Sequence, residues 1–195
     1  VEQNLDNQTG QIYAGSQANI HTTELNNQQG TIYSQNQLDL NASQLNNQQG
    51  QIYSEGQAQL KVQGDIQNQK GVLAAGQNLK INSAGLDNTA GTIRSEKADI
   101  TLNAQVQLIN AQGDIYAGHN ASLNSVGLDN SSGQIAAQNQ LTIDTQKQQL
   151  SNQNGKIIAK TVDLKTGKLD NQTGLIQAEQ SVKIDTQQNA LLNNN

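Results

Sequence analysis

One short polar phrase recurs about every twenty residues along this chain, and that period is the strongest constraint on its fold. The phrase reads LDNQTGQIYA from Leu5, LNNQQGTIYS from Leu25 and LNNQQGQIYS from Leu45. A glycine marks the same place in each of nine units: Gly10, Gly30, Gly50, Gly71, Gly91, Gly113, Gly133, Gly155 and Gly174. A fixed period of about 20–50 residues indicates an architecture built from stacked repeats.

The apolar residues of each unit keep fixed distances from the glycine. An aliphatic residue stands five positions before it, another stands two positions after it, and Ala or Ser follows two positions later. Farther on comes an alternating pair, such as Ala18 and Ile20 or Leu141 and Ile143. Alternation with a period of two is typical of half-buried strands, and the Gly, Asn and β-branched content disfavours helices. Each unit therefore predicts two or three short strands joined by tight bends.

Such a unit can form one coil of a solenoid whose strands pair in parallel with the next coil. With about 4.8 Å between coils, nine coils make a rod roughly 43 Å long. Opposite charges are then expected side by side in adjacent coils: Lys80 with Asp99, Asp163 with Lys183, and Lys160 with Glu179. This pattern avoids the repulsion that like charges would cause at that spacing.

An asparagine stands three positions before every glycine. The nine residues are Asn7, Asn27, Asn47, Asn68, Asn88, Asn110, Asn130, Asn152 and Asn171. Asn tolerates a left-handed bend, and its amide can bond the identical amide one coil away, for about 0.5–1.5 kcal/mol each. We favour a structural turn ladder over a surface binding ladder. The glycine is expected to supply either a positive φ or a close backbone approach.

Residues that carry chemistry are few and scattered. His21 and His119 fall in units one and six, about 24 Å apart by coil spacing, so they cannot share a metal ion. The acidic residues lack the paired carboxylates of a glycosidase, which disfavours a polysaccharide-active enzyme. Cysteine is absent, which excludes disulfides and thiolate metal sites. The sequence predicts no catalytic residue, no metal site and no cofactor.

The composition also bears on partners. The 11 Lys and Arg residues form no basic cluster, which argues against nucleic-acid binding. No apolar run approaches the roughly 18 residues typical of a membrane span, so an integral membrane segment is not expected.

One outward column suggests a binding surface. Tyr13, Tyr33 and Tyr53 occupy the same place in three successive units, and Tyr116 occupies it again in unit six. They are expected to point outward and to stack as a stripe. Aromatic stripes bind sugar faces, but cross-strand stacking worth about 0.2–1 kcal/mol per pair also explains them. We favour stacking and keep glycan binding as the alternative.

The phrase Leu-[Asp/Asn]-Asn-x-x-Gly-x-Ile-x-[Ala/Ser], carried from Leu5 to Ile184, resembles the haemagglutinin repeats of filamentous haemagglutinin and of contact-dependent growth inhibition exoproteins. The resemblance implies a right-handed parallel β-helix within a long Gram-negative exoprotein. It also implies an outer-membrane two-partner secretion transporter as partner and a secreted or cell-surface location. We expect residues 1–195 to be a single β-helix segment excised from such a protein.

The function expected from this resemblance is structural. The segment would be a stalk that projects an adhesive or toxin-bearing tip away from the cell. The alternative is an adhesin module that itself binds a host glycan, or a receptor on a host or neighbouring cell, through the tyrosine stripe. The sequence does not decide between an adhesin and a growth-inhibition toxin as the parent protein.

Overall fold

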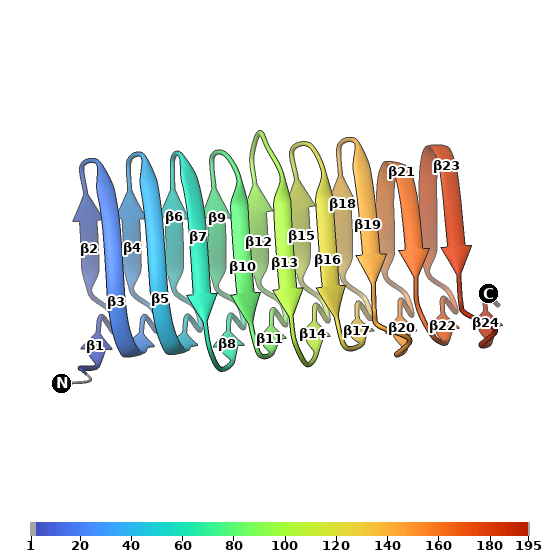
Figure 1. Cartoon of the computed structure of the whole chain (residues 1–195), viewed down its shortest axis with the longest axis horizontal. Helices are drawn as coiled ribbons and strands as arrows, with labels where there is room; N and C mark the ends of the chain where they lie inside the picture. The colour runs from blue at the N-terminus through green and yellow to red at the C-terminus, as the bar shows by residue number, and fades with distance from the viewer. Residues whose placement is uncertain (1–2, 195) are drawn as a thin grey trace.

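The computed structural model describes residues 3–194 and winds them into a β-solenoid of about nine coils (Figure 1). We number the coils 1 to 9 by the glycines Gly10 to Gly174. Each coil has three sides joined by three corners, and every pairing between coils is parallel. The described residues contain no helix. The predicted all-β parallel solenoid is therefore confirmed.

The first side, called the tyrosine face below, follows the glycine of each coil. Its strands are β2 (Gln11–Ala14), β4 (Thr31–Ser34), β6 (Gln51–Ser54), β9 (Val72–Ala75), β12 (Thr92–Ser95), β15 (Asp114–Ala117) and β18 (Gln134–Ala137). In coils 8 and 9 the strands β21 (Lys156–Lys165) and β23 (Leu175–Asp185) run from this side onto the second.

The second side carries longer strands in the first two coils. Its strands are β3 (Gln17–Asn26), β5 (Gln37–Asn46), β7 (Gln57–Val62), β10 (Leu79–Ser83), β13 (Ile100–Ala104), β16 (Ala121–Ser125) and β19 (Gln140–Asp144). The third side holds two-residue strands, namely β1 (Leu5–Asp6), β8 (Ile66–Gln67), β11 (Leu86–Asp87), β14 (Leu108–Ile109), β17 (Leu128–Asp129), β20 (Leu150–Ser151), β22 (Leu169–Asp170) and β24 (Leu191–Leu192).

The aliphatic columns of the sequence form the interior of the rod. Leu86 pairs with Ile66 and Leu108, and Ile93 pairs with Leu73 and Ile115, so each side chain lies above its counterpart. These interior side chains are almost fully buried, while their neighbours in each strand face outward. Alternation of period two thus fills a narrow core with one layer of aliphatic residues per coil.

The repeat length varies at two of the three corners. Three residues separate Ala75 from Leu79 at the first corner, whereas four separate Ser95 from Ile100. At the second corner, three residues separate Ala104 from Leu108, whereas two separate its counterpart Ser125 from Leu128. The spacing from the third-side Leu or Ile to the glycine is five in every coil. The corner that carries the asparagine therefore has a constant length.

The observed register corrects one of the expected charge pairs. Lys80 pairs with Gln59 and Thr101, not with Asp99, because Leu79 pairs with Ile100 and Asp99 therefore lies two positions before the partner of Lys80. Asp99 instead lies beside Asn78.

The other two expected pairs have different outcomes. Asp163 and Lys183 do pair across coils, with Nζ 3.4 Å from the carboxylate. Lys160 lies at a register shift between Ala159 and Thr161, and within residues 3–194 it makes no ion pair with Glu179.

Candidate functional site

The asparagine of every coil lies at the third corner, directly above the asparagine of the coil before. From Asn7 to Asn171, each Nδ2 donates to the Oδ1 of the next asparagine at 2.6–2.7 Å. All nine side chains are at most 7% exposed. The structure adds a tenth member, since Asn171 donates to Asn193 at 2.6 Å. The spacing of Asn193 from Leu191 repeats the Leu-x-Asn motif, so the sequence already contained this signal.

Asn88 illustrates how each amide is paired. Its Oδ1 accepts from Asn68, and its Nδ2 donates to Asn110 at 2.7 Å. The same Nδ2 donates to the carbonyl oxygens of Gly91 and Asp114 at 3.2 and 3.4 Å. Both the acceptor and the donor hydrogens of a buried amide are therefore paired, as burial of a polar group requires. An array of neutral, fully paired amides has no free group for catalysis.

The glycine beside each ladder asparagine allows a close backbone approach. A Cβ at Gly50 would lie 2.1 Å from the carbonyl oxygen of Asn27, and one at Gly91 would lie 2.2 Å from that of Asn68. The left-handed conformation falls on the residue before the glycine, as at Gln49, whose φ is 56°. Of the two roles expected for the glycine, close approach is the one observed. The ladder asparagines themselves do not have a positive φ.

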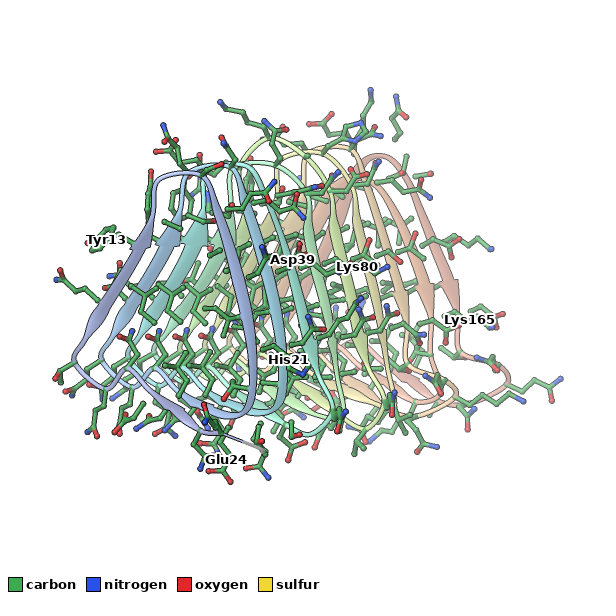
Figure 2. The ribbon with its side chains drawn as sticks, turned by 60° about the vertical axis from the view of Figure 1, so that its left-hand side comes forward. Tyr13, His21, Glu24, Asp39, Lys80 and Lys165 are labelled. Atoms are coloured by element: carbon green, nitrogen blue, oxygen red, sulfur yellow. The ribbon has the colours of Figure 1, made fainter. Side chains whose placement is uncertain are left out.

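The tyrosine column lies on the outside of the tyrosine face. Tyr13, Tyr33 and Tyr53 are paired in register, and their ring centroids are 5.7 and 6.0 Å apart with tilted planes. Figure 2 shows Tyr13 projecting from this face, away from the side that carries Asp39 and Lys80. Tyr13 is 65% exposed, while the other two are half-buried because each is flanked by a neighbouring coil.

The stripe does not reach Tyr116 without a break. Ala74 and Arg94 occupy the same column in coils 4 and 5. The guanidinium of Arg94 lies over the Tyr116 ring, 5.1 Å from its centroid, which is cation–π geometry. The structure therefore brings three of the four tyrosines together and joins the fourth to Arg94. Arg94 was not singled out from the sequence, although its position in the tyrosine column could have been read from the repeat.

Carboxylates surround the middle of this stripe. The hydroxyl of Tyr33 donates to Glu55, and this bond, with burial and the negative charge of Glu55, raises the pKa of Tyr33 to about 12. Burial, with Glu96 and Glu55 nearby, also raises the pKa of Tyr53. The surface around the stacked rings therefore carries negative charge. Glu55 and Glu96 share one column, three positions after the inward Ile, which the sequence analysis did not use.

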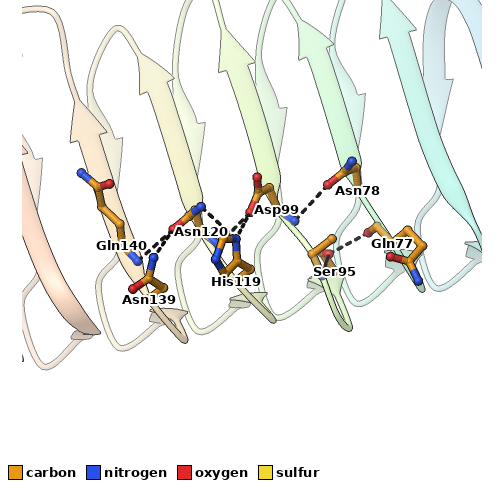
Figure 3. A network of polar contacts seen from close by, with 9 residues as sticks. Gln77, Asn78, Ser95, Asp99, His119, Asn120, Asn139 and Gln140 are labelled. Atoms are coloured by element: carbon orange, nitrogen blue, oxygen red, sulfur yellow. Dashed lines mark hydrogen bonds and ion pairs between the residues drawn. The ribbon is translucent and has the colours of Figure 1, made fainter.

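The histidines lie in different coils, His21 on the second side of coil 1 and His119 at the first corner of coil 6. His119 Nδ1 is 2.8 Å from Asp99 Oδ1 at the first corner (Figure 3). The backbone N–H of Asp99 donates to Asn78 Oδ1, the side chain of Asn120 contacts His119, and Asn139 Nδ2 donates to Asn120 Oδ1. Burial tends to raise the pKa of Asp99, but bonds from the Asn120 amide and from His119 outweigh it and lower that pKa. This network links four successive coils through exposed polar groups.

Within residues 3–194 no three of the residue types His, Cys, Asp and Glu gather in a group that could hold a metal ion. No helix in this part of the chain is long and apolar enough to cross a membrane. The geometry consists of a stacked backbone, an internal amide ladder and one outward aromatic stripe. These features define a repetitive β-solenoid.

Comparison with known families identifies the repeat. The haemagglutinin repeat family matches residues 2–70, 68–117, 99–154 and 117–194, which together span almost the whole chain. The chain belongs to this family and is a haemagglutinin-repeat shaft segment. The family is typical of secreted and cell-surface bacterial proteins. Neither the curated proteins nor the solved structures contain a significant match.

Proposed function

We propose that this segment is a rigid stalk of a Gram-negative exoprotein and that it holds an adhesive or toxin-bearing tip away from the cell surface. The observation that carries the proposal is the unbroken amide ladder from Asn7 to Asn193. Each coil pairs its backbone and its asparagine with both neighbours, so bending the rod requires breaking buried bonds. A segment built in this way is stiff, keeps a constant cross-section and holds its two ends at a fixed distance.

Two further parts of this proposal rest on the family. The transport partner is an outer-membrane two-partner secretion transporter, through which the chain passes unfolded. The absence of cysteine is compatible with that route, since no disulfide can form before export. Folding of one coil on the previous one then helps to draw the chain outward. Both an adhesin and a contact-dependent growth inhibition toxin need such a stalk.

Deletion of two middle coils tests the stalk function. Removing residues 92–133 joins Gly91 directly to Gln134, so two coils are lost and the register of the ladder is kept. The parent protein should still be exported, and its tip activity should decline gradually as reach is lost, by about 10 Å for two coils. Complete loss of binding by a folded, exported deletion variant would instead assign the binding activity to these coils.

The second candidate is a binding module on the tyrosine face, and the exposure of Tyr13 favours it. Stacked rings beside Asn and Gln amides present apolar faces and hydrogen-bonding groups, a combination that suits sugars. Replacing Tyr13, Tyr33 and Tyr53 by serine should abolish retention on a glycan array if this function is correct. Equal retention of the folded variant would eliminate it, and Tyr116→Ser serves as the matched control outside the stacked group.

A further inference from the structure

Charged side chains are distributed unevenly along the tyrosine face. Residues 1–60 contain no Lys or Arg, whereas residues 147–168 contain five lysines and one acidic residue. On this face, Glu55 of coil 3 and Glu96 of coil 5 are exposed, and coil 8 presents Lys156 and Lys160. The tyrosine face thus carries Glu55 in coil 3 and two lysines in coil 8, while Arg94 and Glu96 lie in coil 5, Asp114 in coil 6 and Glu179 in coil 9.

The opposite charges also occupy matching columns. Glu55 and Lys160 each stand three positions after the inward isoleucine of their coil. Tyr53 and Ile158 each stand one position after it and face outward. Glu55 therefore follows the outward Tyr53, and Lys160 follows the outward Ile158, at the same two-residue spacing.

We propose that the tyrosine face binds the same face of a second copy of this chain, with the two rods antiparallel. A two-fold axis parallel to the strands reverses the order of the coils and leaves each column opposite itself. Coil 3 then faces coil 8, coil 4 faces coil 7, and coil 5 faces coil 6. Glu55 meets Lys160 of the second copy, and Tyr53 meets Ile158, twice in each pair.

The remaining positions fit this arrangement. Ala74 faces Ala136 of the second copy, and these two small residues allow the sheets to approach closely. Arg94 faces Tyr116 of the second copy and repeats the cation–π contact that it makes within its own chain. From coil 2 to coil 9, no two like charges oppose each other in the three outward columns.

A parallel pair of rods is unfavourable on the same face. A two-fold axis along the rod places each coil opposite itself and reverses the columns. Arg94 would then face Arg94, and Lys156 would face Lys160 of the second copy. Like charges in direct opposition destabilise an interface, so the charges select the antiparallel pair.

The expected interface is small. Eight coils at about 4.8 Å, each contributing a four-residue strand about 13 Å long, cover roughly 500 Å² on each partner. The total of about 1,000 Å² lies at the lower limit for a specific interface. The pair should therefore be weak, with a dissociation constant in the micromolar range, and salt should weaken it further.

Charge reversal tests the pairing directly. Sedimentation equilibrium in low salt should show dimers for the unchanged protein, and Glu55→Lys or Lys160→Glu should each weaken association at least tenfold. The double variant restores opposite charges at both contacts and should recover affinity to within about threefold. Lys61→Glu, on the second side, is the matched control and should leave association unchanged. Circular dichroism verifies that each variant folds.

Zero-length cross-linking with a carbodiimide supplies a test that needs no variant. Glu55 and Lys160 lie five coils apart in one chain, about 24 Å, so a covalent bond between them must join two copies. The intrachain pair Asp163–Lys183, at 3.4 Å, is the internal control. Recovery of the Glu55–Lys160 product supports the proposal. A monomer at high protein concentration in low salt, or a double variant no tighter than the single ones, would overturn it.

Discussion

Coils 1–2 and coils 3–9 share one corner and differ at the other two. In coils 1 and 2 the ten-residue strands β3 and β5 run through the second corner without a break. In coils 4 to 6 the corresponding strands β10, β13 and β16 have five residues and end there in a bend. The steps between glycines are 20 in the first coils and vary from 19 to 22 later.

The third corner is unchanged throughout this variation. Its asparagine bonds two neighbours, and the carbonyl of the previous coil leaves no space for a Cβ at the glycine. The other corners are mostly exposed, and fewer of their residues approach a carbonyl of the previous coil so closely. One corner therefore fixes the stacking of the coils, while the other two absorb changes of length.

The largest effect is expected from inserting a residue at the constant corner. A glycine inserted between Thr89 and Ala90 would displace Gly91 from Asn88 and break the ladder, with a loss of at least about 3 kcal/mol. The same insertion between Val126 and Gly127, at a corner of variable length, should cost less than about 1 kcal/mol. Urea unfolding followed by circular dichroism measures both. Equal losses would refute the distinction between the corners.

A single ladder residue should have the next largest effect. Asn88→Ala removes one acceptor of Asn68 Nδ2, leaves the buried Oδ1 of Asn110 without its donor and should destabilise the fold by about 2–5 kcal/mol. Asn103 is the matched control, since it donates to Asn82 at 3.0 Å on the partly exposed second side. Asn103→Ala should cost less than about 1 kcal/mol. The difference in urea midpoint between the two variants is the quantity to compare.

A smaller, stabilising effect is expected inside coil 5. The hydroxyls of Ser83 and Ser125 are buried without a partner, and Ala104 lies between them. Coils 2 and 3 hold a bonded pair of this kind, Ser34 to Ser54, at 3.0 Å.

Ala104→Ser should therefore connect the two hydroxyls and stabilise the fold by about 0.5–1.5 kcal/mol. Ala137→Ser, beside Ala117, has no such partner and should destabilise it. Thermal unfolding of both variants is the test, and a fall in melting temperature for Ala104→Ser would contradict the expectation.

The smallest effect concerns the tyrosines of coils 2 and 3. The raised pKa of Tyr33, about 12, means that the folded state holds this proton more tightly than the unfolded state. Its contribution to stability is complete below the usual tyrosine pKa of about 10 and is lost as the pH rises through about 12. Glu55→Gln should lower the pKa of Tyr33 toward the usual value. Ultraviolet titration of tyrosinate detects this shift, and an unchanged titration curve would argue against the role of Glu55.

Most of the fold could be predicted because the same residues recur at fixed positions and mark where each unit begins. The Leu, Asn, Gly and Ile columns gave the coils, their parallel pairing and the vertical alignment of Leu86 with Leu108. The alternating inward residues also place Lys80 after Leu79 and Asp99 before Ile100, so the failure of that charge pair could have been read from the sequence. The register shift at Lys160 could not be predicted, because no pattern in the sequence specifies which corner position bulges.

The candidate sites also contain features that the repeat predicts and features that it does not. The repeat alone places Tyr13, Tyr33 and Tyr53 in one column, since a fixed period specifies which residues share a height on the coil. The tertiary structure decided that the left-handed residue precedes the glycine, that Glu55 bonds Tyr33 and that Arg94 lies over Tyr116. Periodicity determines which residues are neighbours, whereas side-chain rotamers and backbone turns depend on how the neighbouring coils pack around them.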